Sequence, residues 1–308
     1  MNIGILGSGF IVPIFIENAT KIRDYHIRAV WGRHPEKITA FKDRADYVTS
    51  DLKKILNDEK IDVIYVALPN SLHYEYARKA LQAGKDVLLE KPFCVTYEQT
   101  RKLINYARKK KRLLFETIMT IHTQNYRKMQ KHLTRIGDIR MIEGSFSQYS
   151  RRYDRFCKGE ILPAFDRSLA GGALMDLGIY NIHYVCGLFK EPLSTDYLPN
   201  LVNGIDTSGI LLLDYGSFKA SLVNAKDSQG ESHITIQGTK GRITCLGTAS
   251  RCALIRITMN DGSCIEYRDG NDSEFTGMSL PENPSARNSS MYPSANARIS
   301  SAVFVRPG

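Results

Sequence analysis

Residues 1–16 of the chain read MNIGILGSGFIVPIFI. The apolar residues Ile3, Ile5 and Leu6 indicate a short buried strand, which runs directly into Gly7-Ser8-Gly9. An apolar helix is expected to follow, with Pro13 in its first turn, where a missing N–H costs little. Such a strand, glycine turn and helix place the pyrophosphate of a dinucleotide on a helix N-terminus.

The glycines of this turn have separate expected roles. Gly7 permits the tight turn, and Gly9 lets phosphates approach the backbone because it has no Cβ. The third glycine position of the fingerprint is occupied by Val12, which is expected to crowd the helix against the strand. A G-x-G pattern is weak evidence by itself, because glycine turns after strands are common.

Bulk composition indicates an ordinary globular protein. The chain has 308 residues, 43% hydrophobic and 24% charged, which predicts two domains. No apolar stretch approaches the roughly 18 residues of a membrane span, and no signal peptide pattern is present at the N-terminus. Six scattered cysteines without a C-x-x-C pair predict a reduced, cytoplasmic protein without a metal site.

The formal charge of +10 raises the question of a nucleic-acid partner. The one dense basic run, residues 108–112, lies where a helix is expected to end. Cations there offset the helix macrodipole, so we favour a solvated helix end over a nucleic-acid patch. A diffuse positive field also favours anionic ligands such as a phosphorylated cofactor.

Residues 1–118 alternate between strand and helix patterns. Strands are predicted at 2–6, 26–31, 46–48, 62–67, 86–89 and 113–116. Helices are predicted at 12–20, 35–44, 51–56, 72–83 and 97–109. This alternation predicts an α/β fold, a Rossmann-type doubly wound parallel sheet.

Residues 119–270 have a different pattern. Helices are predicted at 124–135 and 176–189, and strands at 139–150, 209–215, 218–223, 233–237, 242–245, 252–259 and 264–267. This pattern predicts a C-terminal α+β domain with an open, mostly antiparallel sheet. Residues 271–308 form a Ser-, Asn- and Pro-rich tail without a clear period, which we expect to be poorly ordered.

Two motifs directly follow predicted buried strands, where ligands bind in doubly wound sheets. The first is Ala67-Leu68-Pro69-Asn70-Ser71-Leu72-His73, which is also consistent with a turn and a helix cap. The second is Glu90-Lys91-Pro92, in which Lys91 could donate to a substrate oxygen or take part in proton transfer. The alternative for Lys91 is an exposed loop lysine paired with Glu90.

A third motif spans Gly171-Gly172 to His183, and its glycine pair allows close approach to a ligand. Asp176 and Tyr180 are spaced i, i+4, so they share one helix face, which His183 extends. Asp176 could instead cap the helix, and Tyr180 could be a half-buried aromatic. For His183 we favour a satisfied core histidine.

Together these motifs resemble the Gfo/Idh/MocA family (glucose–fructose oxidoreductase, inositol dehydrogenase and related proteins), and they extend over most of the chain. The tyrosine at 180, where histidine is more usual, resembles the branch that contains dimeric dihydrodiol dehydrogenase. The matching pieces are Gly7-Ser8-Gly9, Pro69-Asn70-Ser71-Leu72-His73, Glu90-Lys91-Pro92, and Gly171-Gly172 with Asp176-Leu177-Gly178-Ile179-Tyr180.

The resemblance implies hydride transfer between NAD(P) and a secondary alcohol or ketone of a sugar, polyol or dihydrodiol. It implies that Lys91 hydrogen-bonds the reacting oxygen, that Tyr180 is the general acid/base, and that Asp176 orients or tunes it. It also implies a homodimer or other homo-oligomer, often formed through the open sheet. The residues expected to bind the cofactor are Gly7, Gly9, Phe10, Ile11, Arg33, Leu68, Pro69, Asn70, His73, Glu90 and Lys91.

The end of the second predicted strand bears on the choice of cofactor. An NAD site needs a carboxylate there for the ribose 2′-OH, but the chain has Trp31-Gly32-Arg33-His34. Arg33 is placed to pair with a 2′-phosphate, with Lys37 assisting, which predicts NADP while leaving NAD possible. The substrate pocket is expected to draw on Tyr149, Arg151, Arg152 and Tyr153.

Two other functional interpretations remain open at this point. One is a non-catalytic NADP-binding regulatory protein that keeps the Rossmann fold. The other is an intact cofactor domain beside a second domain that the unusual tail leaves incomplete.

Overall fold

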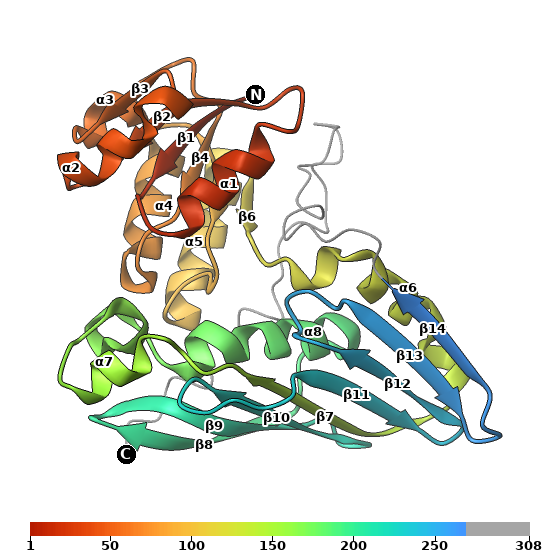
Figure 1. The fold of residues 1–308 in the computed structure, drawn as a ribbon. Helices are drawn as coiled ribbons and strands as arrows, with labels where there is room; N and C mark the ends of the chain where they lie inside the picture. The colour runs from red at the N-terminus through yellow and green to blue at the C-terminus, as the bar shows by residue number, and fades with distance from the viewer. Residues whose placement is uncertain (269–308) are drawn as a thin grey trace. The chain divides into compact units, whose positions relative to one another are not determined.

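The computed structural model describes residues 1–268 and shows two compact units (Figure 1). The first unit spans Met1–Thr117, and the second begins at Ile118. The expected poorly ordered tail, residues 271–308, lies outside the described residues. Among the helices described, none is both long and apolar enough to cross a bilayer.

The first unit is built on a six-stranded parallel sheet in the order β3-β2-β1-β4-β5-β6. This is the order of a dinucleotide-binding fold, in which the chain reverses direction across the sheet between β1 and β4. The strands are β1 (Asn2–Leu6), β2 (His26–Trp31), β3 (Tyr47–Thr49), β4 (Val63–Val66), β5 (Asp86–Leu89) and β6 (Leu114–Glu116).

Helices cover both faces of this sheet, which explains why its strands are almost continuously apolar. On one face, Phe15 of α1 stacks on Tyr65 of β4 with ring centroids 4.0 Å apart. On the other face, Ile64 and Val66 join a core cluster with α4 and α5. The helices are α1 (Ile11–Ala19), α2 (Pro35–Ile38), α3 (Leu52–Leu56), α4 (His73–Gln82) and α5 (Tyr97–Lys110).

Local capping chemistry explains some of the helix ends. The Asp51 carboxylate accepts a hydrogen bond from the Lys53 N–H at 2.8 Å and caps the start of α3. Gly84 adopts φ +75° directly after α4. The basic run occupies the last turn of α5, where it offsets the macrodipole. No side-chain cap is made at the start of α4, where Asn70 or Ser71 was expected to provide one.

The second unit contains an eight-stranded sheet in the order β14-β13-β12-β11-β7-β10-β9-β8. All neighbours are antiparallel except β7 and β10, which run parallel. The strands are β7 (Ile139–Ser147), β8 (Ser194–Val202), β9 (Ile205–Asp214), β10 (Lys219–Ala225), β11 (His233–Gly238), β12 (Gly241–Leu246), β13 (Leu254–Met259) and β14 (Cys264–Arg268). The expected fold class is confirmed.

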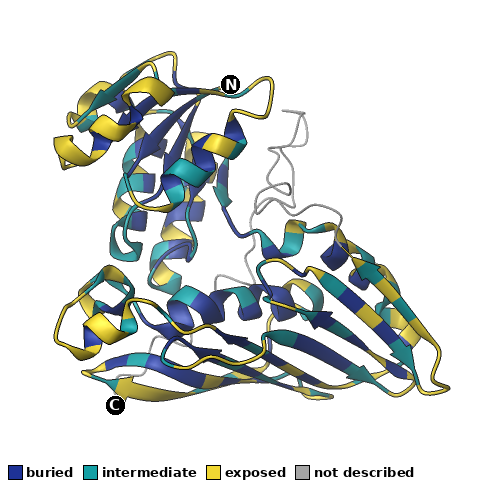
Figure 2. Ribbon diagram, in the orientation of Figure 1, coloured by how far each residue is buried: buried dark blue, intermediate teal, exposed yellow. Residues whose placement is uncertain are grey.

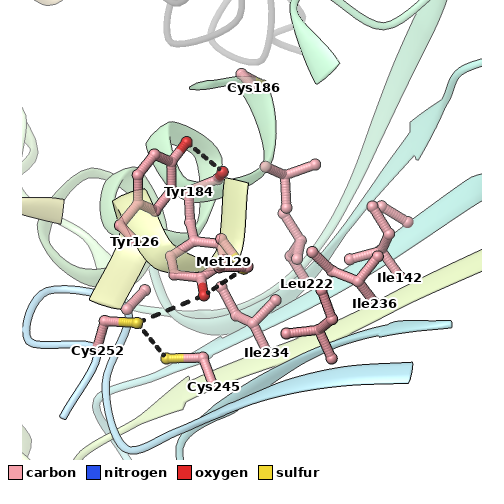
Figure 3. Packing of buried hydrophobic residues seen from close by; sticks show 14 of the residues in the cluster. Tyr126, Met129, Ile142, Tyr184, Cys186, Leu222, Ile234, Ile236, Cys245 and Cys252 are labelled. Carbon is pink, nitrogen blue, oxygen red and sulfur yellow. Dashed lines mark hydrogen bonds between the residues drawn. The ribbon is translucent and has the colours of Figure 1, made fainter. Parts of the chain in front are cut away.

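Helices α6 (Gln124–His132) and α8 (Ile179–Phe189) lie along one face of this sheet (Figure 1). Buried and exposed residues alternate along its strands because, in the part of the chain that the structure describes, no helix covers the other face (Figure 2). Between the helices and the sheet, Tyr184 is fully buried, and its hydroxyl donates to Met129 Sδ at 3.0 Å (Figure 3). The thiols of Cys245 and Cys252 lie 3.2 Å apart beside it.

Two elements of the second unit were not predicted. Strand β8 contains Pro199 and several polar residues, which argue against a strand. It is tolerated because β8 is an edge strand, where a missing N–H removes no ladder hydrogen bond. The short helix α7 (Tyr153–Cys157) has too few residues to show a helical period.

Candidate functional site

In the first unit, the candidate functional residues lie along one edge of the six-stranded sheet. Because the strands are parallel, their carboxyl ends meet at that edge, and the loops that follow β1, β2, β4 and β5 gather there. Backbone hydrogen bonds continue past the strand ends and fix these loops: Gly7 N–H donates to Trp31 O at 2.9 Å and Ala67 N–H to Leu6 O at 2.8 Å. Glu90 N–H donates to Val66 O at 3.0 Å.

The two glycines of the first loop differ in their surroundings. Gly7 adopts φ +133°, and a Cβ there would overlap the backbone carbonyl of Ala67. At Gly9, a Cβ would meet no atom of residues 1–268 within 4 Å. Gly7 is therefore required by the packing of β1 against β4, whereas the space beside Gly9 is open to a ligand.

Helix α1 begins at Ile11, immediately after this open space. Its N-cap residue is Phe10, whose side chain is 71% exposed, and no side chain caps the first turn. An uncapped N-terminus with a positive dipole end fits an anionic group such as a pyrophosphate. Val12 is fully buried. The crowding expected at this position stays a prediction.

The loop after β2 comes close to the glycine turn. A Cβ at Gly32 would lie 3.6 Å from Ser8 Oγ, so this loop and the first loop are neighbours. Arg33 is exposed beside them. The nearest following carboxylate, Glu36, lies 3.4 Å from His34 Nδ1. The loop therefore presents a cation where an NAD site presents a carboxylate.

His73 is fully buried at the start of α4, although it was expected to touch the cofactor. Its Nδ1 lies 2.8 Å from Pro92 O and its Nε2 lies 2.8 Å from Leu68 O. Burial lowers the pKa of the ring, and the two carbonyl oxygens act against this effect. The imidazole thus ties together the loops after β4 and β5. Between them, Leu68, Pro69 and Asn70 are partly exposed.

Hydrogen bonds with several neighbouring residues hold the turn that carries Lys91. Tyr65, a core residue that sequence reasoning did not single out, donates its hydroxyl to Glu90 Oε1 at 2.6 Å. Lys91 N–H donates to Glu90 Oε2 at 3.2 Å, and Phe93 N–H donates to Glu116 Oε1 at 2.9 Å. The Lys91–Pro92 peptide bond is cis. These contacts make Lys91 part of an ordered turn rather than of a loose surface loop.

In the second unit, Asp176 lies in a π-helical turn, Leu174–Gly178, that leads into α8. The sequence predicted a regular helix from Asp176 onward, but Ile179 N–H bonds to Leu174 O, five residues back. Asp176 and Tyr180 remain one helical turn apart. The Tyr180 ring is partly buried, with its centroid 5.6 Å from that of Phe146.

Close packing explains two glycines of this motif. A Cβ at Gly178 would lie 2.9 Å from Asn224 Cγ, so glycine lets the π turn approach β10. A Cβ at Gly172 would overlap the Asp206 carboxylate, which accepts hydrogen bonds from Leu174 N–H at 2.7 Å and Tyr197 Oη at 2.8 Å. The interpretation of Gly172 as making room for a ligand is therefore corrected: it makes room for Asp206.

Asp176 has a partner that sequence reasoning missed. Lys226, directly after β10, places its Nζ 2.5 Å from Asp176 Oδ2. The signal in the sequence was a lysine at the end of an apolar strand, the same signal that singled out Lys91. His183, on the same helix, is 1% exposed, which confirms the core position expected from the sequence.

The region around α7 holds the residues expected to line the substrate pocket. Tyr149 Oη donates to Asp154 Oδ1 at 2.6 Å, and this hydrogen bond is the main cause that raises the pKa of Tyr149 to about 12. The Tyr149 ring meets the Tyr153 ring edge-on at 5.9 Å. Arg151 is exposed beside them. Within residues 1–268, no group of His, Cys, Asp and Glu side chains is arranged to hold a metal ion.

Comparisons with known proteins agree with this geometry. Residues 1–118 match the model of an oxidoreductase family with an NAD-binding Rossmann fold, and residues 126–244 match the Gfo/Idh/MocA C-terminal domain. The chain is 36% identical to the scyllo-inositol 2-dehydrogenase (NADP⁺) of Bacillus subtilis over 263 residues, which cover 84% of this chain and 79% of that protein.

A second relative is the trans-1,2-dihydrobenzene-1,2-diol dehydrogenase of Xenopus tropicalis, 29% identical over 71% of this chain and 67% of that one. The fold is also that of a 3-ketoreductase from Actinomadura kijaniata, solved with NADP and TDP-benzene. The TM-score is 0.80 at 21% identity, over 99% of this chain and 96% of that one. The oxidoreductase class expected from the sequence is confirmed, and the chain belongs to the Gfo/Idh/MocA family.

Proposed function

We propose that the protein is an NADP-dependent dehydrogenase or reductase that acts on a secondary alcohol, or the matching ketone, of a polyol, sugar or dihydrodiol. One observation carries this proposal. Hydrogen bonds hold the turn that presents Lys91, and this turn lies at the same sheet edge as the open glycine turn. The inositol and dihydrodiol dehydrogenases among the relatives support this substrate class.

The cofactor proposal rests on the loops of the first unit. The open space at Gly9 and the uncapped start of α1 suit the pyrophosphate, and Arg33 suits a 2′-phosphate. The loops after β4 and β5 are proposed to contact the rest of the cofactor, with His73 supporting them from the core. The residues assigned to the cofactor are Gly7, Gly9, Phe10, Ile11, Arg33, Leu68, Pro69, Asn70, Glu90 and Lys91.

The chemistry divides between the cofactor and the side chains. Bound NADP⁺ supplies the hydride acceptor for the carbon that carries the reacting hydroxyl. Lys91 donates a hydrogen bond to the reacting oxygen, Tyr180 accepts its proton during alcohol oxidation and returns it during reduction, and Asp176 tunes Tyr180. In this proposal residues 1–118 form the cofactor domain and residues 119–270 form the substrate and dimerisation domain.

We also propose that the protein works in the reducing cytoplasm. All six cysteines are free thiols, and the sulfur atoms of Cys245 and Cys252 lie 3.2 Å apart. Reduced thiols are typical of proteins kept in that environment.

A homodimer through the uncovered sheet face is part of the proposal. On this face Leu198, Ile210 and Val223 form a row across β8, β9 and β10, and Leu198 and Ile210 are 55% and 40% exposed. Leu212, also 40% exposed, extends the apolar surface. Exposed apolar surface of this kind is typical of a protein interface.

The two glycines of the first loop give a matched test of the cofactor site. Gly7→Ala is expected to lower the free energy of unfolding by about 2 kcal/mol or more, because the new Cβ overlaps Ala67 in a strained backbone conformation. Gly9→Ala is expected to leave the stability of the ligand-free protein almost unchanged and to weaken NADPH binding about tenfold or more. Denaturant unfolding and fluorescence titration measure both effects; unaltered NADPH affinity in Gly9→Ala would count against the site.

Arg33 decides the preference between the two nicotinamide cofactors. The wild type is expected to bind NADPH more tightly than NADH, and Arg33→Ala to lose about tenfold in NADPH affinity with little change for NADH. Lys42→Ala, which removes a cation from the same segment, serves as the control. A wild type that prefers NADH would overturn the assignment of Arg33.

Turnover is tested with NADP⁺ and a panel of inositols, hexoses and vicinal diols, followed by NADPH absorbance. Lys91→Ala and Tyr180→Phe are each expected to lower kcat about 100-fold or more, since each removes a proton-handling or oxygen-binding group. Lys102→Ala and Tyr106→Phe are the matched controls on α5. A wild type that binds NADPH and turns over no member of the panel would favour a regulatory, non-catalytic protein.

The dimer is tested by light scattering coupled to gel filtration. The wild type is expected to elute at twice the chain mass of 34.7 kDa, and Ile210→Asp at the monomer mass, because a carboxylate in an apolar interface is costly. Ile161→Asp, at a residue 71% exposed outside the sheet, is expected to stay dimeric. A monomeric wild type contradicts the proposal.

A further inference from the structure

Lys226 is a buried cation in the second unit. Its side chain is 3% exposed, and its Nζ lies 2.5 Å from Asp176 Oδ2. On another side, the Nζ lies 4.8 Å from the centroid of the Phe165 ring, which belongs to an aromatic cluster with Phe156. A lysine is rarely this buried unless it is paired, so the carboxylate is the partner that makes its burial tolerable.

The position of this ammonium is fixed by the backbone. Lys226 N–H donates to Thr207 O at 2.8 Å, and Ser150 N–H donates to Lys226 O at 2.9 Å, so β9 on one side and the segment after β7 on the other hold the residue. Gly178 allows the π turn to approach the same strand, β10, from the helix side. The helix and the strand thereby bring Asp176 and Lys226 together.

The Asp176 carboxylate depends less on its partner than the Lys226 ammonium does. The Asp176 side chain is 38% exposed, so water can solvate its carboxylate without the lysine. The lysine, by contrast, has little access to water and needs its counter-charge. The pair therefore does more to fix the direction of Asp176 than to make its ionisation possible.

Two other carboxylates, those of Asp206 and Asp227, lie around the Asp176–Lys226 pair, and they come from different parts of the fold. Asp206 of β9 interacts with the Lys226 charge, but it also caps Leu174 and accepts from Tyr197. Asp227 accepts hydrogen bonds from Thr207 and Ser208, and its charge is felt by Tyr153 of α7. Asp176 is the carboxylate in direct contact with the ammonium.

We propose that Lys226 is a positioning residue for the reaction: its ammonium holds the Asp176 carboxylate in place, one helical turn before Tyr180, and offsets the negative charge of that carboxylate. This inference rests on the proposed function, in which Tyr180 handles the proton. Residues i and i+4 of a helix lie about 5–6 Å apart at their Cβ atoms, close enough for one charge to act on the other group.

The sign of the effect follows from the charges. A bare carboxylate beside Tyr180 disfavours the tyrosinate and raises the pKa of the hydroxyl, whereas the nearby ammonium opposes this effect. Removing the ammonium therefore raises the pKa of Tyr180 and moves the pH profile of alcohol oxidation toward alkaline pH. Lys226→Met removes the charge and keeps much of the side-chain volume.

The first test needs no turnover. The full-length protein is labelled with ¹³Cζ-tyrosine, the Tyr180 signal is assigned with Tyr180→Phe, and its titration is followed by NMR. The Tyr180 pKa is expected to rise in Lys226→Met and to stay unchanged in Lys219→Met. Lys219 is the matched control, because it stands at the other end of β10 in an exposed pair with Asp214 at 2.8 Å.

The second test is a double-mutant cycle on kcat. Lys226→Met is expected to lower kcat about tenfold and to shift the pH profile, with NADPH affinity retained. In the Asp176→Asn background the same substitution is expected to have little further effect, because its action passes through Asp176. Thermal unfolding of each variant shows whether the fold is retained.

The outcomes separate the two proposals. An unchanged Tyr180 titration in a folded Lys226→Met variant overturns the positioning role, and so does a loss of kcat that is equally large in the Asp176→Asn background. A raised Tyr180 pKa in a protein that turns over no substrate supports the electrostatic role of Lys226 and overturns the proposed function.

Discussion

The parallel pairing of β1 with β4 is the constraint on which the first unit depends. Hydrogen bonds carry this pairing beyond the strand ends, where Ala67 N–H reaches Leu6 O. At that point Gly7 must lack a side chain, because the Ala67 carbonyl occupies the space that a Cβ needs. The same close approach directs the chain into the open turn at Gly9 and the uncapped start of α1.

Support for the Lys91 turn comes from the same sheet edge. Tyr65, from the middle of β4, reaches Glu90, and His73 joins Pro92 to Leu68. Tyr65 and His73 are buried, Glu90 is partly buried, and each of these polar groups has a hydrogen-bond partner. Buried polar networks of this kind lose much of their value when one member is removed, so they act as a unit.

In the second unit, a single buried charge has a comparable role. Lys226 comes from the end of a strand and Asp176 from a π turn 50 residues earlier, and glycine at 178 lets these elements meet. The wider turn of a π helix is often associated with functional sites. Here it lies between the helix start that Asp206 caps and the helix that carries Tyr180.

Much of the fold could be read from the sequence because its signals are local. The apolar strands of the first unit, the helix cap at Asp51 and the positive-φ glycine after α4 depend on near neighbours in the chain. Strand β8 was not predicted because its proline and polar residues are unusual in a strand. They are tolerated at the edge of a sheet, and only the completed sheet defines which strand is the edge.

The sequence by itself determined the parallel sheet, the loops at its carboxyl edge, and the residues Lys91, Asp176 and Tyr180 as candidates. Only the tertiary structure decided that His73 supports two loops from the core, that Gly172 makes room for Asp206, and that Lys226 is paired with Asp176. The physical reason is distance along the chain. Periodicity and turn chemistry act over a few residues, whereas hydrogen bonds and ion pairs join groups that only folding brings together.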